Sequence, residues 1–299
     1  MAPFAHMATP EDDRRHVPGP DAMPLWNESF WFPFYDPAHQ VGMVFRFGSY
    51  AKQNKANLFL YLTRGSELVH SFIDHNLPVP AHETGRCTIA GLTIDWEQPL
   101  ERFRLRYANG PHGFDVVWQA TSATYTYPRP PDTSYDLVPG HIEQAGRVTG
   151  RVTIGGTQYA IDCHGHRDHS WGGERDWAKF HRWNYLSGDF GPDFFFNAVR
   201  IDLDGLVIPI GCVWDGKEVL GLDTVGIDVR TADGAARQLG ASVHLVDARG
   251  REHRIEAEEV LVNCPVLYGR TWLKDAFVRY RMGERVAYGI LEHGYVERP

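Results

Sequence analysis

The stretch Arg102-Phe103-Arg104-Leu105-Arg106-Tyr107 alternates between arginines and large apolar side chains. Successive side chains of a strand point to opposite faces, so this stretch predicts a strand with one apolar face and one charged face. Two earlier stretches, residues 41–47 and 57–62, are largely apolar and also have the length of strands. The sequence therefore indicates a sheet that covers an apolar core.

Turn residues divide the chain into short strand-like segments. Gly155-Gly156, Asp204-Gly205, Asp215-Gly216 and Asp233-Gly234 are favoured in hairpins, because such turns need a positive φ that glycine adopts without a Cβ clash. About fifteen strands at short spacing are typical of β-barrels and β-sandwiches. Helical periodicity is nearly absent apart from one candidate turn at residues 177–180, and no glycine-rich phosphate-binding motif occurs. We therefore predict an all-β fold rather than a nucleotide-binding α/β fold.

The composition is that of an ordinary globular protein and excludes several classes. The 299 residues have a formal net charge of −8, which argues against binding to nucleic acid. The aromatic content of 13% can build a deep core or line a cavity. Neither a secretory signal nor a long apolar run is found, so we expect a cytoplasmic protein without stable membrane insertion. The four cysteines form no CxxC pair, and we expect buried thiols.

We expect three segments along the chain. Residues 1–20 are charged and rich in proline, so they predict a flexible or loosely docked arm. Residues 21–178 are expected to form a first β-rich domain that ends in a histidine-rich motif, and residues 179–299 a second one. The motif would then lie near the junction of the two domains, where binding sites often form.

The motif reads His164-Gly165-His166-Arg167-Asp168-His169-Ser170-Trp171-Gly172. In a strand, His164, His166 and Asp168 would share one face. If the chain left the strand at residue 167, Asp168 and His169 would lie on a loop instead. In both cases imidazole and carboxyl groups gather within a few residues, which is typical of metal sites, acid–base sites and buried polar networks.

Three interpretations of the motif are open. As a string, His-x-His-x-Asp-His matches the metal-ligand signature of hydrolases with the metallo-β-lactamase fold. That fold alternates strands with helices, however, and the downstream histidines of this chain lack the loops it requires. Alternatively, Asp168 in an aromatic, poorly solvated pocket would have a raised pKa and act as an acid. In the third, structural interpretation, an Asp-His hydrogen bond locks the end of a barrel.

The motif also resembles a family signature. Residues 165–172 are similar to the Gly-Tyr-x-Asp-His-x-Trp-Gly signature of the carotenoid 1,2-hydratase (hydroxyneurosporene synthase) and AttH-like superfamily, with His166 in place of the tyrosine. Residues 27–32 resemble the opening strand of that superfamily, and residues 288–292 its C-terminal strand. The resemblance implies two lipocalin-like antiparallel β-barrels packed together, with very little helix. Similar double barrels include fungal Diels–Alderases and ceramide-handling proteins, so the fold fixes the function only loosely.

Hydratases of this superfamily protonate an isoprenoid double bond and add water to the resulting cation. By that resemblance we predict a lyase of the hydratase type, an isomerase or a cyclase, acting on an apolar isoprenoid, terpenoid or steroid-like molecule. Asp168 would donate the proton, His169 would orient the acid or shuttle the proton, and Trp171 would face the cation with its ring. No organic cofactor and no metal ion is expected.

Further residues are predicted to bind the substrate. Glu28 either pairs with an arginine as a buried bridge or is a second acid that faces Asp168. His181 and Trp183 alternate with an arginine on an expected strand, so both could face one cavity. The other candidates for substrate binding are Trp31, His166 and Asn197.

Two other functions stay open at this level. A carrier of lipids or terpenoids needs the cavity but no titrating acid, so its ligand affinity would survive Asp168→Asn and no product would form. A metal-dependent hydrolase would contain stoichiometric zinc, iron or manganese. The leading interpretation and the carrier both have a hydrophobic small molecule as partner, and the sequence leaves the oligomeric state open.

Overall fold

The computed structural model describes residues 8–128, 139–203, 206–232 and 237–297. These residues form nineteen β-strands and two short 3₁₀-helices, η1 (Ala51–Gln53) and η2 (Trp177–Lys179), and no α-helix. The second 3₁₀-helix falls where one helical turn was predicted. The prediction of an all-β fold is confirmed. Within these residues, no helix combines the length and the apolar character needed to span a membrane.

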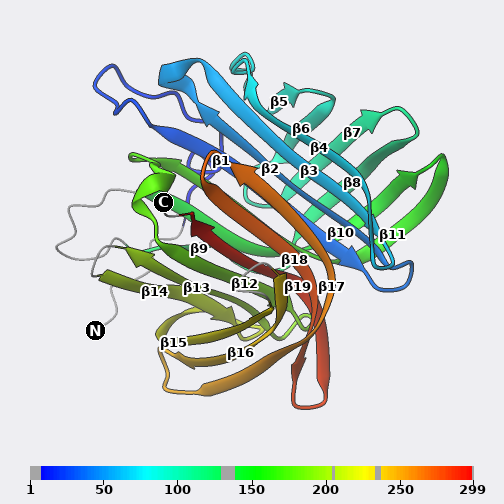
Figure 1. The fold of residues 1–299 in the computed structure, drawn as a ribbon, viewed down its shortest axis with the longest axis vertical. Helices are drawn as coiled ribbons and strands as arrows, with labels where there is room; N and C mark the ends of the chain where they lie inside the picture. The colour runs from blue at the N-terminus through cyan, green and yellow to red at the C-terminus, as the bar shows by residue number, and fades with distance from the viewer. Residues whose placement is uncertain (1–7, 129–138, 204–205, 233–236, 298–299) are drawn as a thin grey trace. The chain divides into compact units, whose positions relative to one another are not determined.

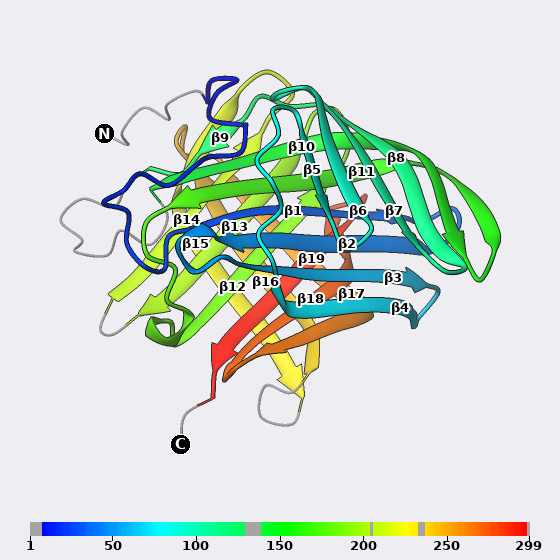
Figure 2. The same ribbon diagram turned by 90° about the horizontal axis from the view of Figure 1, so that it is seen from above.

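The described residues divide into two compact units, the first within His6–Arg175 and the second within Asp176–Pro299. The first unit is an antiparallel sheet of eleven strands, in the order β4-β3-β2-β1-β11-β10-β8-β7-β6-β5 with β9 beside β10. Figure 2 shows its long strands side by side, with blue β1 between β2 and green β11. The strands are β1 (Asn27–Asp36), β2 (Val41–Tyr50), β3 (Lys55–Arg64), β4 (Glu67–Leu77), β5 (Arg86–Ile89), β6 (Leu92–Gln98), β7 (Arg102–Asn109), β8 (His112–Ala120), β9 (Tyr125–Thr126), β10 (Gly140–Ile154) and β11 (Thr157–Gly172).

One face of this sheet carries the core of the unit. In β7 the side chains of Phe103, Leu105 and Tyr107 are all buried, as the alternation predicted. On the other face Arg104 pairs with Asp115 of β8 at 2.8 Å. Burial of an apolar side chain of this size contributes about 1.5–3 kcal/mol. We call the face that carries these core side chains the inner face, and the opposite one the outer face.

The two longest strands of the sheet form a hairpin. β10 pairs with β11 along its whole length. Gly155 and Gly156, which join them, have φ angles of 58° and 83°, a region in which a side chain would be strained. The hairpin predicted at this Gly-Gly pair is confirmed. It fixes which residue of β10 lies opposite each residue of the histidine-rich motif.

The second unit is a closed antiparallel barrel of eight strands (Figure 1). They are β12 (Arg182–Asp189), β13 (Phe195–Leu203), β14 (Leu206–Trp214), β15 (Val219–Ala232), β16 (Arg237–Asp247), β17 (Glu252–Tyr268), β18 (Thr271–Met282) and β19 (Arg285–Val296). Leu186, Phe196 and Tyr280 lie completely buried in its core. The prediction of two lipocalin-like antiparallel β-barrels is confirmed, with one difference. The first sheet is open, because its end strands β4 and β5 are not hydrogen-bonded to each other.

The N-terminal segment differs from the expected arm. Residues 1–7 lie outside the described residues, but Asp13 is completely buried. The Asp13 carboxylate accepts hydrogen bonds from the Arg167 guanidinium, at 2.6 Å from Nη1 and 3.1 Å from Nη2. Its carbonyl accepts another from the Trp96 indole at 2.6 Å. A buried charge is tolerated only when it is paired in this way, so the segment around Asp13 is anchored on the inner face.

The four cysteines, Cys87, Cys163, Cys212 and Cys264, are free and buried, as the sequence predicted. Burial raises the pKa of the Cys87 thiol to about 12. It also raises the pKa values of Cys163 and Cys264. Because the thiolate is the reactive form, these three cysteines are poor nucleophiles at neutral pH.

Candidate active site

The histidine-rich motif lies within a single strand, β11. Its side chains therefore alternate between the two faces of the sheet along the whole motif. His164, His166 and Asp168 share the outer face, as predicted for a strand. The alternative in which the chain leaves the strand at residue 167 is wrong. His169 and Trp171 point to the inner face, so the predicted catalytic pair of Asp168 and His169 is divided between two faces.

On the outer face, Asp168 belongs to a group of titratable side chains. Glu143 of β10 lies directly opposite it in the strand register. The Glu143 carboxylate accepts hydrogen bonds from Nε2 of His141 at 2.6 Å and from Nε2 of His166 at 2.5 Å. It accepts a third from the Tyr127 hydroxyl at 2.8 Å. We call His141, Glu143, His166 and Asp168 the Asp168 cluster.

The two carboxyl groups of the Asp168 cluster have different electrostatic environments. Burial alone would raise the pKa of Glu143, but the adjacent His141 and His166 outweigh it and lower the pKa to about 2. For Asp168, burial is the largest influence and raises the pKa to about 7, and the Glu143 charge acts in the same direction. Cationic groups nearby oppose this shift without cancelling it. The cluster therefore pairs a fully ionised carboxylate with a carboxyl group that holds a proton near neutral pH.

Two predicted substrate-binding residues lie at the Asp168 cluster. Trp31 of β1 is opposite Asp168 in the strand register. Its ring is 5.8 Å from that of His166, at an interplanar angle of 70°. Trp31 and His166 are buried, whereas Asp168 keeps part of its surface exposed. An acid with access to solvent thus stands beside a large aromatic ring.

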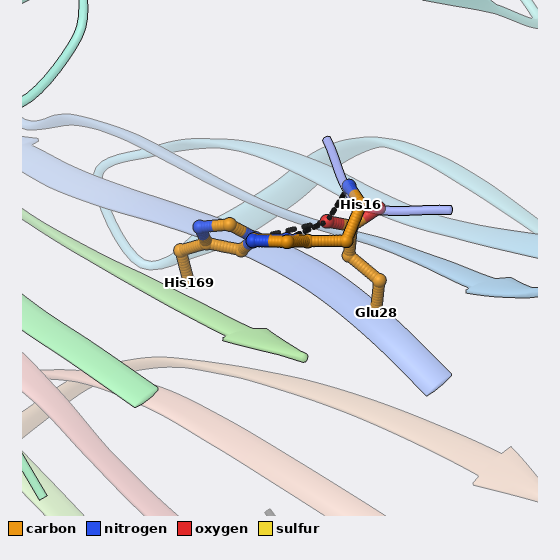
Figure 3. Close-up of side chains that lie close together, drawn as sticks. All are labelled: His16, Glu28 and His169. Atoms are coloured by element: carbon orange, nitrogen blue, oxygen red, sulfur yellow. Dashed lines mark hydrogen bonds and ion pairs between the residues drawn. The ribbon is translucent and has the colours of Figure 1, made fainter. Parts of the chain in front are cut away.

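A second group lies on the inner face, where Figure 3 shows two imidazole rings approaching one carboxylate. Nδ1 of His16 is 2.9 Å from Oε1 of Glu28, and Nε2 of His169 is 3.2 Å from the same oxygen. The His16 ring stacks on Trp171, with centroids 4.6 Å apart. The His169 ring stacks on Phe30 at 4.0 Å. We call His16, Glu28 and His169 the Glu28 cluster.

The charge state of Glu28 follows from its partners. Burial would raise its pKa, but the hydrogen bonds from His16 and His169 outweigh burial and lower the pKa. Burial also lowers the pKa of His169, against the opposing influence of Glu28. An ionised carboxylate thus lies against an imidazole that burial keeps neutral. A position of Glu28 facing Asp168 is wrong, because β1 directs Glu28 to the inner face. Among the described residues, its side-chain partners are His16 and His169 rather than an arginine.

Arg167 forms the rest of the polar network on the inner face. Its guanidinium is completely buried and donates to the Gln144 amide oxygen at 2.7 and 3.0 Å, in addition to Asp13. It also lies 4.6 Å from the ring centroid of Phe103 and 5.2 Å from that of Trp118. The ion pair with Asp13, the hydrogen bonds to Gln144 and the two aromatic rings together offset the free-energy cost of burying the guanidinium charge.

The remaining candidates lie in the second unit. His181 precedes β12, and Trp183 within β12 donates a hydrogen bond to Glu292 and contacts the ring of Trp177 at 5.2 Å. Asn197 of β13 is completely buried. Their role in binding a substrate stays a prediction.

A pocket of about 580 Å³ opens in the first unit beside the N-terminal segment. Its wall includes His16 and Trp96 together with charged side chains such as Arg15 and Glu83. His16 is therefore shared between the pocket and the Glu28 cluster. Glu28 and His169 lie behind it with almost no exposed surface.

The sequence prediction missed His16, His141 and Glu143. His141 and Glu143 are two residues apart, the spacing that places two side chains on one face of a strand. Many surface strands share that signal, so it does not single them out. His16 lies in a stretch without periodicity, and no sequence pattern connects it with Glu28.

The fold is shared with several solved structures of low sequence identity. A Nitrosomonas europaea protein described as AttH is 14% identical, with a TM-score of 0.64 and coverage of 99% of both chains. Kievitone hydratase from Nectria haematococca is 11% identical, with a TM-score of 0.63 and coverage of 98% of this chain and 94% of that one. CghA with Sch210972 is 11% identical, with a TM-score of 0.62 and coverage of 91% and 89%.

At such identities the likeness shows the fold alone, and that fold agrees with the AttH-like resemblance of the sequence. No curated protein matches the sequence. The family model described as a domain of unknown function (DUF7064) matches residues 9–296. The match covers nearly the whole chain, and the chain therefore belongs to the DUF7064 family.

Proposed function

We propose that the chain is an enzyme of the hydratase, isomerase or cyclase type that acts on an apolar small molecule at the Asp168 cluster. The position of Asp168 carries the proposal. It is a part-exposed carboxyl group between the buried carboxylate of Glu143 on β10 and the ring of Trp31 on β1. Kievitone hydratase and CghA with Sch210972, which share the fold, support an enzyme of this kind. Because one fold hosts many functions, the geometry of the site has to decide.

In the proposed reaction Asp168 transfers its carboxyl proton to one carbon of a carbon–carbon double bond. The neighbouring carbon becomes a cation, which the face of an aromatic ring stabilises by about 0.5–2 kcal/mol. Addition of water and return of one proton to the Asp168 carboxylate completes a hydration, whereas transfer of a proton from an adjacent carbon to the same carboxylate completes an isomerisation. Glu143, held by His141 and His166, adds negative charge beside the developing cation.

This proposal reassigns two roles expected from the sequence. Trp31 replaces Trp171 as the ring that faces the cation, because Trp171 points to the inner face. The Glu143 carboxylate with its histidines replaces His169 as the partner of Asp168. For the substrate we propose an isoprenoid, terpenoid or steroid-like molecule, whose trisubstituted double bonds give tertiary cations on protonation.

Asp168→Asn tests the proposal once a substrate has been identified, for example from a ligand that co-purifies. General acid catalysis is worth about 10²–10⁴-fold, and we expect a loss of turnover in that range. The matched control is Asp162→Asn on the same strand and face, where the side chain is 58% exposed and paired with Arg147. Unchanged turnover in folded Asp168→Asn would refute the acid assignment. Retained ligand affinity with no product from the wild-type protein would identify a carrier.

A further inference from the structure

The three side chains of the Glu28 cluster have the composition and spacing of a metal site (Figure 3). Nδ1 of His16 and Nε2 of His169 lie 2.9 and 3.2 Å from Oε1 of Glu28, and all three potential ligand atoms are within 4.8 Å of one another. A tetrahedral ion with bonds of about 2.0–2.1 Å holds its ligand atoms about 3.3 Å apart. Both observed separations are slightly shorter than that value, so one ion fits if the side chains move apart by a few tenths of an ångström.

The ligand atoms are held in place by groups that do not coordinate. The backbone N–H of His16 donates to Oε1 of Glu28 at 2.8 Å and so fixes the carboxylate. Stacking on Trp171 orients the His16 ring, and stacking on Phe30 orients the His169 ring. The three ligands come from distant parts of the chain, yet each has its own support. A site whose ligands are pre-positioned in this way loses little entropy when an ion binds.

A second observation concerns the other nitrogen of His169. Among the described residues, Nδ1 is buried and has no hydrogen-bond partner. It lies 3.8 Å from Oδ1 of Asp13, whose carboxylate is fixed by Arg167. Metal-bound histidines usually donate their other N–H to a carboxylate, which sets the tautomer and the ring orientation. Coordination through Nε2 would place the proton on Nδ1, toward Asp13.

One of the three ligand residues is reached by solvent. The His16 side chain is 25% exposed and forms part of the wall of the 580 Å³ pocket, whereas Glu28 and His169 are enclosed. The pocket therefore borders one of the three ligand residues. Two imidazoles and one carboxylate with an open position are the donor set of catalytic zinc sites and of several other divalent first-row metals.

We propose that His16 Nδ1, the Glu28 carboxylate and His169 Nε2 bind one divalent transition-metal ion in the first unit. The proposal is independent of the acid–base function, because its ligands lie at the inner face of the sheet and Asp168 at the outer face. The expected ion is a divalent metal ion of intermediate softness, such as Zn²⁺. A negative result for metal binding would therefore leave the acid–base proposal unaffected, and the reverse also holds.

The test uses the full chain, stripped with a chelator and titrated with Zn²⁺ in a calorimeter. We expect one ion per chain. Co²⁺ in place of Zn²⁺ should give the visible absorption of a tetrahedral site with nitrogen and oxygen ligands. His16→Ala removes a part-exposed ligand and Glu28→Gln a buried one, and both should weaken Zn²⁺ binding by more than the roughly 10–100-fold that loss of an outer-shell partner costs. Thermal unfolding of each variant without metal reports whether the fold is kept.

Glu143→Gln is the matched control, because Glu143 is also a buried carboxylate between two histidines and belongs to the second group of close potential ligand atoms, His141, Glu143 and Asp168. This variant should keep the ion with unchanged affinity. If the wild-type chain binds no stoichiometric Zn²⁺, the proposal is overturned. It is also overturned if His16→Ala binds as tightly as the wild type, or if Glu143→Gln loses the ion and Glu28→Gln keeps it. If Glu28→Gln does not fold, the Zn²⁺ affinity of His16→Ala alone tests the proposal.

Discussion

The two faces of β11 carry similar groups in different settings. On the outer face Glu143 accepts hydrogen bonds from two histidines, and a second carboxyl group, Asp168, lies beside it. On the inner face Glu28 also accepts from two histidines, but the nearest further carboxylate, Asp13, is neutralised by Arg167. A second carboxyl group with a raised pKa makes the outer face suited to proton transfer. On the inner face, the two imidazoles and the carboxylate of the Glu28 cluster form a donor set for a cation.

The comparison also explains how one short motif can serve two chemistries. Neighbouring residues of a strand cannot reach the same site, because their side chains leave the backbone in opposite directions. Asp168 and His169 are adjacent in sequence but belong to different clusters. A histidine next to an aspartate in a strand is therefore weak support for an Asp-His dyad.

The largest predicted effect concerns the ion pair of the inner face. Arg167→Met leaves Asp13 buried without its partner, and loss of one partner of a buried pair typically costs about 3–5 kcal/mol of unfolding free energy. Urea unfolding, monitored by tryptophan fluorescence, measures this loss of unfolding free energy. Arg147→Met, which breaks the exposed pair with Asp162, should change stability by less than about 1 kcal/mol. Equal effects in the two variants would show that burial of the pair has no energetic consequence.

The next effect is a pH dependence on the outer face. The folded pKa of Glu143, about 2, lies below its ordinary value of 4.5, so its ionisation stabilises the fold above pH 4.5 and is lost as the pH falls toward 2. The difference in unfolding free energy between wild type and Glu143→Gln should therefore be roughly 3 kcal/mol at pH 6. It should shrink steadily between pH 4.5 and pH 3. A difference that stays constant over this range would contradict the lowered pKa.

A smaller effect separates the two tryptophans. If Trp31 faces the cation, Trp31→Leu should lower turnover of the identified substrate by about tenfold, corresponding to about 1.4 kcal/mol of transition-state stabilisation. Trp171→Leu should leave turnover nearly unchanged, because the indole stacks on His16 at the inner face. Steady-state kinetics of both variants gives the ratio of their turnover numbers. The opposite ranking would restore the role that the sequence suggested for Trp171.

The sequence predicted the fold better than the site. Alternation in residues 102–107 and the Gly155-Gly156 turn are local signals, and both elements form as predicted. The partners of Asp168 depend on the register between β10 and β11, a long-range property that no local pattern contains. His16 comes from an aperiodic segment whose position depends on the buried pair of Asp13 and Arg167. Local patterns therefore predict strands, whereas side-chain neighbours across strands need the structure.

The division of the motif between two faces can be tested without a substrate by two double-mutant cycles on unfolding free energy. One cycle combines Asp168→Asn with Glu143→Gln, and the other combines Asp168→Asn with His169→Gln. We predict a coupling of about 1 kcal/mol between Asp168 and Glu143, and additivity within about 0.3–0.5 kcal/mol for Asp168 and His169. A coupling to His169 that exceeds the coupling to Glu143 would contradict the assignment of Asp168 to the outer cluster.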